Sequence, residues 1–387
     1  MRFTDCIDIT GESCKKFVGK KIYISTGAVD VDYVDLNQIE TVNYDTKPSR
    51  ANLITDDNSI LFAKMQGTKK VLFIDKGLEK KLYSTGFFSV APKKNILNKK
   101  CLFHLLGSKT FLSQKDKYCS GATQKSITLE GLNKIEITIP NLEDQDKIVK
   151  ILDSIKVTIE SYKKEIKKYD ELIKARFIEM FGDVRENSNE FEIVQFNDIV
   201  EYMGDIGSNG ANKVVVNHLD MKDEEDYAIM VRFTNFTKND FKNDVKYISK
   251  DAYDFFKKSQ IFGGELIVCK IGSAGQNYVM PYLNRPVSLG LNQIMIRIKD
   301  TILMPYLYQY LHTDYGEFLI SGCINGAVTK TITKTELKKI PILLPPMEFQ
   351  QEFADFVEQV DKSREAVKKS LEKTQQLYDS LMQEYFG

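Results

Sequence analysis

The chain has 387 residues and a net charge of zero, with 42% apolar and 28% charged residues. This length allows two domains that each bury a core of their own. No apolar run of about 18 residues occurs, and the start MRFTDCIDIT lacks the apolar segment of a secretory signal, so we expect a soluble, cytoplasmic protein. The six cysteines form no C-x-x-C pair and there are only three histidines, which argues against a metal centre.

Residues 1–140 predict a first globular domain of mixed α/β type with short strands. The strand candidates are KKIYIS (20–25), SILFAKM (59–65), KVLFID (70–75) and GFFSVAP (86–92). The segment is basic, with 22 Lys and Arg against 15 Asp and Glu. Charge alone does not identify a nucleic-acid partner, because attraction to phosphates depends on a local patch.

Residues 141–183 predict one long helix. Its apolar and aromatic residues alternate at spacings of four and three, which is the heptad seam of a coiled coil. Asn141 or Asp144 can cap the start of the helix, and Gly182 can end it. The seam residues are Ile148, Leu152, Ile155, Ile159, Tyr162, Ile166, Tyr169 and Ile173.

Residues 184–343 predict a second mixed α/β domain. Its strand candidates are YAIMVRF (227–233), ELIVCKI (265–271), YVMP (278–281) and QIMIRI (293–298), and short helices are expected at 252–258 and 305–311. The tyrosines at 306, 308 and 310 fit a packed helix face better than a surface that stacks on DNA. SILFAKMQG and ELIVCKIGS also match each other, which aligns Lys64 with Lys270.

Residues 344–387 predict a second long helix that keeps the phase of the first. Residues 120–182 and 325–387 align at a constant shift of 205 without a gap, and 20 of the 63 positions are identical. Residues 1–119 and 184–324 have diverged. Since neither helix can bury its seam alone, we expect the two to pack together. The predicted fold is α+β: two mixed domains separated by an antiparallel coiled coil, with pseudo-two-fold symmetry.

Sequence signatures of catalysis are missing from the chain. It contains no G-x-x-x-x-G-K-[ST] loop, no G-x-G-x-x-G after a strand, no G-x-S-x-G and no H-E-x-x-H. Pro345-Pro346 is not preceded by Asn or Asp, as the adenine-binding loop of amino-methyltransferases requires. These absences favour a binding protein over an enzyme.

The duplicated block resembles the conserved regions of the specificity (S) subunits of type I restriction–modification systems. The resemblance rests on I-P-x-L-x-x-Q-x-x-I-V at 139–149 and I-x-L-P-P-x-x-F-Q-Q at 342–351, each leading into a long helix that stops at F-G. GGELIVCKIGSAGQNYVMP (263–281) resembles a strand and loop of their target recognition domains. The first domain departs from this pattern, reading MQGTKK where the second reads IGSAGQ.

The resemblance implies a non-catalytic subunit that reads a bipartite, asymmetric double-stranded DNA target with two recognition domains. It also implies two modification (methyltransferase) subunits and two restriction (ATP-dependent translocase and nuclease) subunits as partners. S-adenosylmethionine, ATP and Mg²⁺ would then bind those partners and not this chain. The helix pair would set the gap between the half-sites. Two alternatives stay open: a recognition arm of a type IIB/IIG-like enzyme, and a coiled-coil adaptor that binds only protein.

The candidate DNA-binding residues are polar residues in loops. Arg, Lys, Asn and Gln read base edges, and these residues together with Ser and Thr bind phosphates. In the first domain the candidates are Lys64, Gln66, Thr68, Lys69 and Lys70. In the second domain they are Ser208, Asn209, Asn212, Lys213, Arg232, Thr234, Asn235, Lys270, Ser273, Gln276 and Asn277. Gln124 and Lys125, matched by Thr329 and Lys330, form a pair of loops suited to phosphates.

Overall fold

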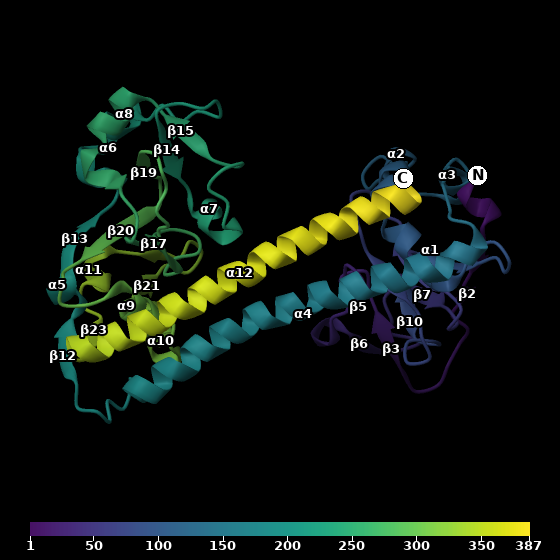
Figure 1. The fold of residues 1–387 in the computed structure, drawn as a ribbon, viewed down its shortest axis with the longest axis horizontal. Coiled ribbons are helices and arrows are strands. Elements are labelled where there is room, and N and C mark those ends of the chain that lie inside the picture. Colours follow the sequence, from purple (N-terminus) through teal and green to yellow (C-terminus); the bar gives the residue numbers. More distant parts are fainter. The chain divides into compact units, whose positions relative to one another are not determined.

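The computed structural model describes residues 1–387, which form two compact units. Unit 1 comprises Met1–Glu165 and Val367–Gly387, and unit 2 comprises Ile166–Ala366. Two long helices are divided between the units, so that each unit contains one part of α4 (Leu142–Phe181) and one part of α12 (Met347–Phe386) (Figure 1). The division at 1–140, 141–183, 184–343 and 344–387 therefore stays a prediction about sequence segments.

Two β-sheets and a small hairpin form the framework of unit 1. One sheet has the strand order β1-β11-β8-β9 and is antiparallel throughout. The other has the order β2-β7-β10-β3-β6, with β10 and β3 parallel. The strands are β1 (Ile7–Thr10), β2 (Glu12–Ser13), β3 (Lys20–Ile24), β4 (Val29–Asp30), β5 (Tyr33–Val34), β6 (Glu40–Asn43), β7 (Ala51–Ile54), β8 (Ile60–Ala63), β9 (Val71–Phe73), β10 (Leu82–Ser84) and β11 (Phe87–Pro92).

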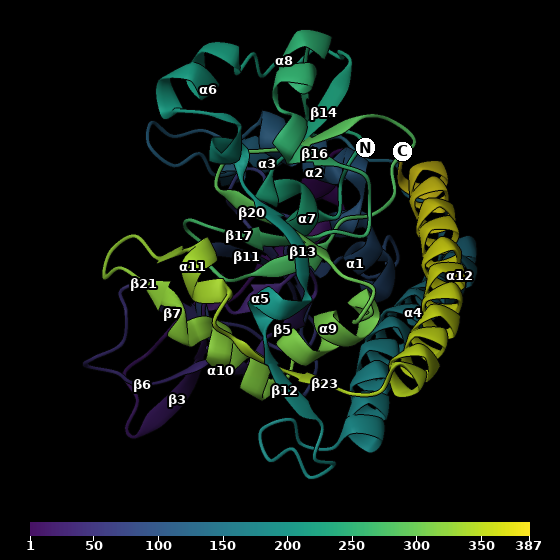
Figure 2. The same ribbon diagram turned by 90° about the vertical axis from the view of Figure 1, so that its left-hand side faces the viewer.

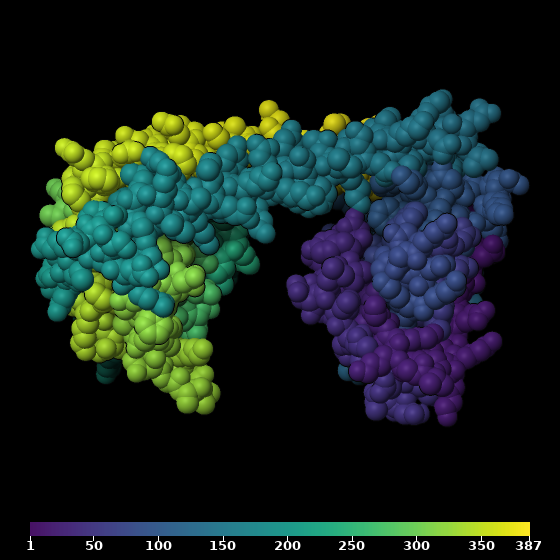
Figure 3. All heavy atoms as spheres, turned by 90° about the horizontal axis from the view of Figure 1, so that it is seen from below, coloured from purple at the N-terminus to yellow at the C-terminus, as the bar shows by residue number.

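Helices cover the antiparallel sheet of unit 1. They are α1 (Lys99–Gly107), α2 (Lys109–Lys117), α3 (Leu129–Leu132) and the adjoining parts of α4 and α12. One core cluster joins Phe62 of β8, Leu105 of α1 and Leu152 of α4. In Figure 3 the start of α4, in teal, lies over the blue α1–α2 segment of this unit.

Unit 2 contains two four-stranded sheets. One has the order β13-β20-β17-β18 and is antiparallel; the other has the order β15-β14-β19-β16, with β14 and β19 parallel. Two short pairs, β12–β23 and β21–β22, complete the unit. The strands are β12 (Glu192–Gln195), β13 (Val200–Gly204), β14 (Ala228–Val231), β15 (Lys246–Ile248), β16 (Gln260–Ile261), β17 (Leu266–Cys269), β18 (Asn277–Val279), β19 (Val287–Leu289), β20 (Gln293–Ile298), β21 (Ile324–Asn325), β22 (Thr331–Ile332) and β23 (Pro341–Leu344).

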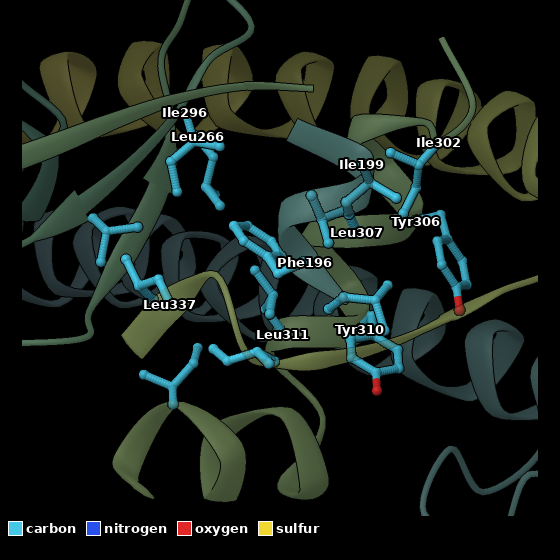
Figure 4. Packing of buried hydrophobic residues seen from close by; sticks show 14 of the residues in the cluster. Phe196, Ile199, Leu266, Ile296, Ile302, Tyr306, Leu307, Tyr310, Leu311 and Leu337 are labelled. Carbon is cyan, nitrogen blue, oxygen red and sulfur yellow. The ribbon is translucent and has the colours of Figure 1, made fainter. Parts of the chain in front are cut away.

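The main core of unit 2 lies between its antiparallel sheet and its helices. Figure 4 shows Leu266 and Ile296 of the sheet directed toward Phe196 and the helix that carries Leu307. The α6–α8 end of the unit lies away from the β12–β23 pair (Figures 1 and 2). The helices wholly within unit 2 are α5 (Phe196–Ile199), α6 (Asn212–His218), α7 (Phe233–Lys238), α8 (Lys250–Phe255), α9 (Met304–Leu311), α10 (Asp314–Gly322) and α11 (Lys334–Leu337).

The duplication extends further in the structure than the identical residues indicate. The sheet β1-β11-β8-β9 of unit 1 has the same chain order of strands as β13-β20-β17-β18 of unit 2. The helices α2 and α3 coincide with α10 and α11 at the shift of 205, and α1 matches α9 to within a residue. Residues 99–117 and 304–322 therefore belong to the repeated framework, although their sequences have diverged.

The two long helices pack antiparallel, as predicted. Within unit 1 the early part of α4, with Ile148 and Leu152, shares a core with Met382 and Phe386 near the end of α12. Within unit 2 the late part of α4, with Phe177, packs against Phe353 near the start of α12, with ring centroids 5.4 Å apart. All eight predicted seam residues of α4 are buried or half-buried.

A buried histidine links three helices in unit 1. His104 of α1 lies 2.9 Å from Asp153 of α4 through Nε2 and 3.2 Å from the Tyr378 hydroxyl of α12 through Nδ1. A neutral imidazole satisfies both contacts, because it can donate to the carboxylate and accept from the hydroxyl. Burial lowers the pKa of His104 despite the adjacent Asp153. The matched residue in unit 2 is Gln309, which is also buried.

A repeated glutamine anchors the start of each long helix. Gln145 and Gln350 are fully buried and 205 residues apart. Gln145 accepts from the Asn98 amide at 2.8 Å and donates to the Ile96 and Pro140 carbonyls. Gln350 accepts from the Leu303 amide at 2.8 Å and donates to the Pro345 and Thr301 carbonyls. Asn98 and Leu303 precede α1 and α9, so the same bond fixes the same helix start in both units.

The predicted strands and long helices are confirmed, with ends that differ by a few residues. β3, β8, β9 and β11 fall within the four predicted runs of the first domain. β14, β17, β18 and β20 match those of the second, and α8 and α9 occupy the two short helices expected there. The tyrosine prediction is also confirmed, because Tyr306 and Tyr310 are buried and donate to the Leu343 and Pro341 carbonyls. The sequence reading did not predict α1, α2 and α10.

Candidate nucleic-acid interface

Two loops meet in each unit at the end of a central strand. We call residues 64–70 and 270–276 the strand loops, because they follow β8 and β17. Residues 120–126 and 325–331 are the glycine loops. In unit 1 the Lys64 carbonyl accepts from the Ile127 backbone amide at 2.9 Å, and the Gln66 backbone amide donates to the Lys125 carbonyl at 3.0 Å. The structure thus brings together two groups of candidate residues that are far apart in the sequence.

Unit 2 repeats this backbone connection. The Lys270 carbonyl accepts from the Ile332 amide at 3.0 Å, and the Gly272 amide donates to the Lys330 carbonyl at 3.1 Å. The joined positions differ from those of unit 1 by 205 or 206 residues. Each unit therefore presents a strand loop and a glycine loop on one shared framework.

A glycine fixes the shape of each glycine loop. Gly121 has φ +134° and Gly326 has φ +100°, in the region that side chains rarely adopt. A Cβ atom would lie 2.6 Å from the Gln124 carbonyl oxygen in the first loop and 2.2 Å from that of Thr329 in the second. The loops fold tightly and leave the candidate residues Gln124, Lys125, Thr329 and Lys330 exposed.

A buried lysine that the sequence reading missed supports the strand loop of unit 1. Lys115 of α2 is 1% exposed and donates to the Met65 and Thr68 carbonyls at 3.0 and 2.8 Å. Asp116 balances its charge at 3.2 Å. Nothing in the sequence distinguishes Lys115 from exposed lysines, because its partners lie on another element. The matched residue in unit 2 is the apolar Ile320.

The strand loop of unit 1 borders a cavity of about 430 Å³. The Lys64 ammonium lies 4.4 Å from the centroid of the Phe88 ring, and burial lowers the pKa of this lysine. Lys70 donates to the Thr26 carbonyl at 2.8 Å. Thr68 is half-buried at the cavity, whereas Gln66 and Lys69 are exposed.

The strand loop of unit 2 starts instead at a three-residue ionic cluster. Asp205, which follows β13, accepts from Lys270 at 2.7 Å and from Lys334 at 3.1 Å. Burial alone would raise the pKa of Asp205, but the two lysines outweigh it and lower the pKa below its usual value. Ser208 completes the cluster, since its hydroxyl donates to Asp205 and lies 3.2 Å from Lys334. The sequence reading missed Asp205 and Lys334.

Three candidate asparagines lie in a helical turn, a helix and a strand, contrary to the loop positions expected for them, and have internal roles. Asn235 is 1% exposed and caps α7 while donating to the Asp240 and Asp244 carbonyls. Asn209 donates to Ser259 and accepts from the Lys258 amide. Asn277 is 6% exposed on β18. Burial and internal hydrogen bonds keep these amides from reading a base edge in this conformation.

The remaining candidates of unit 2 are accessible to different degrees. Arg232 is partly exposed and donates to Asp244 at 2.6 Å, apart from the Asp205 cluster. The hydrogen bonds from Lys238 and Arg232 lower the pKa of Asp244 to about 2. Exposed candidates lie on α6, on α7 and in the strand loop: Asn212, Lys213, Thr234, Ser273 and Gln276. Their contacts with DNA stay predictions.

The long helices carry matched apolar side chains on their surfaces. Leu142 and Met347, one at the start of each helix, are 49% and 40% exposed. Leu172 and Leu377, again 205 residues apart, are 47% and 52% exposed. Each unit therefore exposes one residue of each pair.

Two further features bear on the chemistry of the chain. No group of three or more His, Cys, Asp or Glu side chains is placed to hold a metal ion. None of the helices is long and apolar enough to cross a membrane.

A family model described as the type I restriction modification DNA specificity domain matches residues 7–169 and 189–376. The chain is 23% identical over 366 residues to the putative type I restriction enzyme MjaX specificity subunit of Methanocaldococcus jannaschii, covering 91% of this chain and 82% of that protein. It is 27% identical over 165 residues to the type I restriction enzyme HindI specificity subunit of Haemophilus influenzae, covering 42% and 36%.

Two solved structures share the fold. One is the S subunit of a type I restriction–modification system from M. genitalium, with a TM-score of 0.55 and 14% identity over 100% of this chain and 95% of that one. The other is a chain from a study of complex assembly and conformational transition in a type I R-M system. Its TM-score is 0.57 at 16% identity, over 100% of this chain and 96% of that one.

Proposed function

The chain belongs to the type I restriction–modification DNA specificity family, and from this premise we propose that it reads a bipartite, asymmetric double-stranded DNA target without catalysing a reaction itself. The observation that carries the proposal is the repeated loop framework with unlike side chains. Both units join a strand loop to a glycine loop through the same backbone bonds. Directly after Lys64 the chain reads MQGTKK in unit 1, and directly after Lys270 it reads IGSAGQ in unit 2.

The two strand loops offer different groups to base edges. Gln66 and Lys69 are exposed in unit 1, and Ser273 and Gln276 are exposed in unit 2. Each set contains one glutamine, but a lysine only donates whereas a serine hydroxyl both donates and accepts, so the two sets favour different bases. Two unlike half-sites make an asymmetric target.

The glycine loops suit contacts that do not depend on sequence. Lys125 and Lys330 are exposed at matched positions of the same fold. Exposed lysines at equivalent places can each neutralise one phosphate and fix the register of a unit on the duplex. Phosphate contacts of this kind position the reading loops without contributing to base choice.

Repeated helix surfaces support docking of two copies of one partner. Leu142 and Met347, and likewise Leu172 and Leu377, give the two units equivalent exposed apolar positions. We assign these positions to two modification subunits, with two restriction subunits joining the complex for cleavage. S-adenosylmethionine, ATP and Mg²⁺ belong on those partners in this proposal.

Mapping of methylated adenines in a host that expresses the chain with its modification subunit tests the proposed function. The expected target has two unlike half-sites separated by unspecified bases. A matched variant exchanges Gln66 for Ala, which should relax one half-site and leave the other unchanged. Loss of specificity at both half-sites would contradict the assignment of one half-site to each unit. Absence of any methylation with the cognate partner, in a complex that assembles, would favour the adaptor alternative.

A further inference from the structure

Lys64 and Lys270 occupy matched places but have different charge environments. Both follow a central strand, and both carbonyls accept a bond from the residue just after the glycine loop. Lys270 has the Asp205 carboxylate at 2.7 Å. Lys64 makes no ion pair, and its nearest partner is the Phe88 ring. Unit 1 therefore holds a half-buried cation without an internal counter-ion.

The missing carboxylate has a cause in the fold of unit 1. In unit 2, Asp205 directly follows Gly204 at the end of β13. The matched opening of unit 1 places Glu12 directly after Gly11. Glu12 lies in β2, is exposed and pairs with Ile54 of β7. Because Glu12 belongs to the second sheet of unit 1, its carboxylate does not form the ion pair with Lys64 that Asp205 forms with Lys270.

The cavity beside Lys64 is lined by cationic and hydroxyl-bearing residues. Its volume of about 430 Å³ falls within the usual range of ligand sites. Arg50 and Lys70 also line it, together with the hydroxyl groups of Thr26 and Thr85, and no lining residue is Asp or Glu. Arg50 is exposed and makes no ion pair. Three cations without a carboxylate attract negative charge from outside the chain.

Building on the proposed DNA-reading function, we infer that this cavity receives a backbone phosphate of the DNA. The phosphate oxygens take the place beside Lys64 that the Asp205 carboxylate takes beside Lys270. Arg50 and the threonine hydroxyls supply further donors, and charge-assisted bonds to an oxyanion are stronger than neutral ones. Lys64 accordingly gains a counter-ion only on DNA, whereas Lys270 already has one within unit 2.

The lining favours a phosphate over a nucleobase or a free nucleotide. None of the lining residues is aromatic, so a base has no ring to stack on. Gln124 of the glycine loop also lines the cavity, and this places the anion site beside the loops assigned to DNA. A phosphate held in a continuous backbone fits both observations.

The test measures DNA affinity of the full chain in complex with its modification subunit, over a series of salt concentrations. The duplex carries the motif found by methylation mapping. Each phosphate contact contributes about 0.9 to the slope of log affinity against log salt. We expect Lys64→Gln to reduce the slope by about 0.9 and to weaken binding to all sequences alike. Arg50→Gln, at an exposed position without folding cost, should reduce the slope as well.

Lys76→Gln is the matched control, because Lys76 is exposed and lies outside the cavity. It should keep the wild-type slope. A second arm adds inorganic phosphate to the complex without DNA and follows thermal unfolding. Wild-type slopes in both Lys64→Gln and Arg50→Gln overturn the inference while leaving the proposed function intact. Stabilisation by free phosphate with unchanged DNA slopes also overturns it. A wild-type complex that does not bind the duplex refutes the proposed function, and the inference with it.

Discussion

The strand loops of the two units make the same backbone connections but are held by different side chains. Unit 1 holds its loop through the buried ammonium of Lys115 and leaves Lys64 without a carboxylate. Unit 2 has Ile320 in place of Lys115 and pairs both Lys270 and Lys334 with Asp205. The backbone bonds between the loops are the same in both units. A duplicated framework can therefore keep its geometry while the partners of its charged side chains change.

The largest expected effect concerns the support of the first strand loop. Lys115→Met keeps most of the side-chain volume but removes both bonds to the Met65 and Thr68 carbonyls. Each acceptor that is left buried without a donor costs about 1–3 kcal/mol, so the loss of the two bonds should lower the free energy of unfolding by at least about 1–3 kcal/mol. Urea titration measures it. Lys117→Met on the same helix is exposed and should have no effect. An unchanged stability of the Lys115 variant would show that the loop does not depend on this lysine.

Asp205→Asn should make unit 2 resemble unit 1. The substitution removes the carboxylate charge and leaves Lys270 and Lys334 unbalanced, so the complex should bind DNA with a steeper salt dependence. The slope should increase by about 0.9 for each lysine that gains a phosphate. Binding titrations at several salt concentrations measure this change, with Asp251→Asn as the exposed control. A slope equal to that of the wild type would mean that neither lysine reaches the DNA.

The buried histidine gives unit 1 a pH dependence with no counterpart at the matched position of unit 2, which is Gln309. The folded state lowers the pKa of His104, so its contribution to stability is present above the unfolded value of about 6.5. That contribution is lost as the pH falls below this value. We expect the thermal midpoint of the wild type to fall more between neutral and mildly acidic pH than that of His104→Gln.

His104→Gln introduces the residue that unit 2 has at the matched position, Gln309, so it serves as its own structural control. Asp153 and Tyr378 remain in place in this variant, as do the nearby lysines Lys100 and Lys156. Equal pH profiles for wild type and variant would assign the acid sensitivity to other groups.

The smallest expected effects come from the two glycine loops, and they should be equal. Lys125→Gln and Lys330→Gln each remove one exposed charge at matched positions, so each should reduce the salt slope by about 0.9. In the double variant the salt slope should fall by the sum of the two single reductions, because distant sites act independently. Unequal losses would show that the two units do not contact the backbone in the same way.

Much of the fold could be predicted from the sequence because its signals are local. The heptad spacing of α4 and the apolar runs of β8 and β20 depend only on nearby residues. The helices α1 and α2 are nine residues each, too short for their periodicity to separate them from buried strands. Their match with α9 and α10 became visible only in the structure.

The site could be predicted as a set of loops but not as a set of contacts. Loop chemistry identifies Lys64 and Lys270 as polar positions near strand ends. The ion pairs of Asp205 follow from tertiary folding, since Asp205 lies 65 residues from Lys270 and 129 residues from Lys334. Asn235 illustrates the opposite error, because a residue type suited to reading adenine is used as a helix cap. Composition cannot distinguish the two uses.

The division of α12 between the units has a consequence for the order of synthesis. Met382 and Phe386 belong to the core of unit 1, together with residues from the first third of the chain. Domains made on the ribosome generally fold from the N-terminus onward. Unit 1, although begun first, leaves part of its apolar surface uncovered until the segment 367–387 has emerged, whereas unit 2 needs nothing beyond residue 366. The unit that starts first is thus the last to be complete.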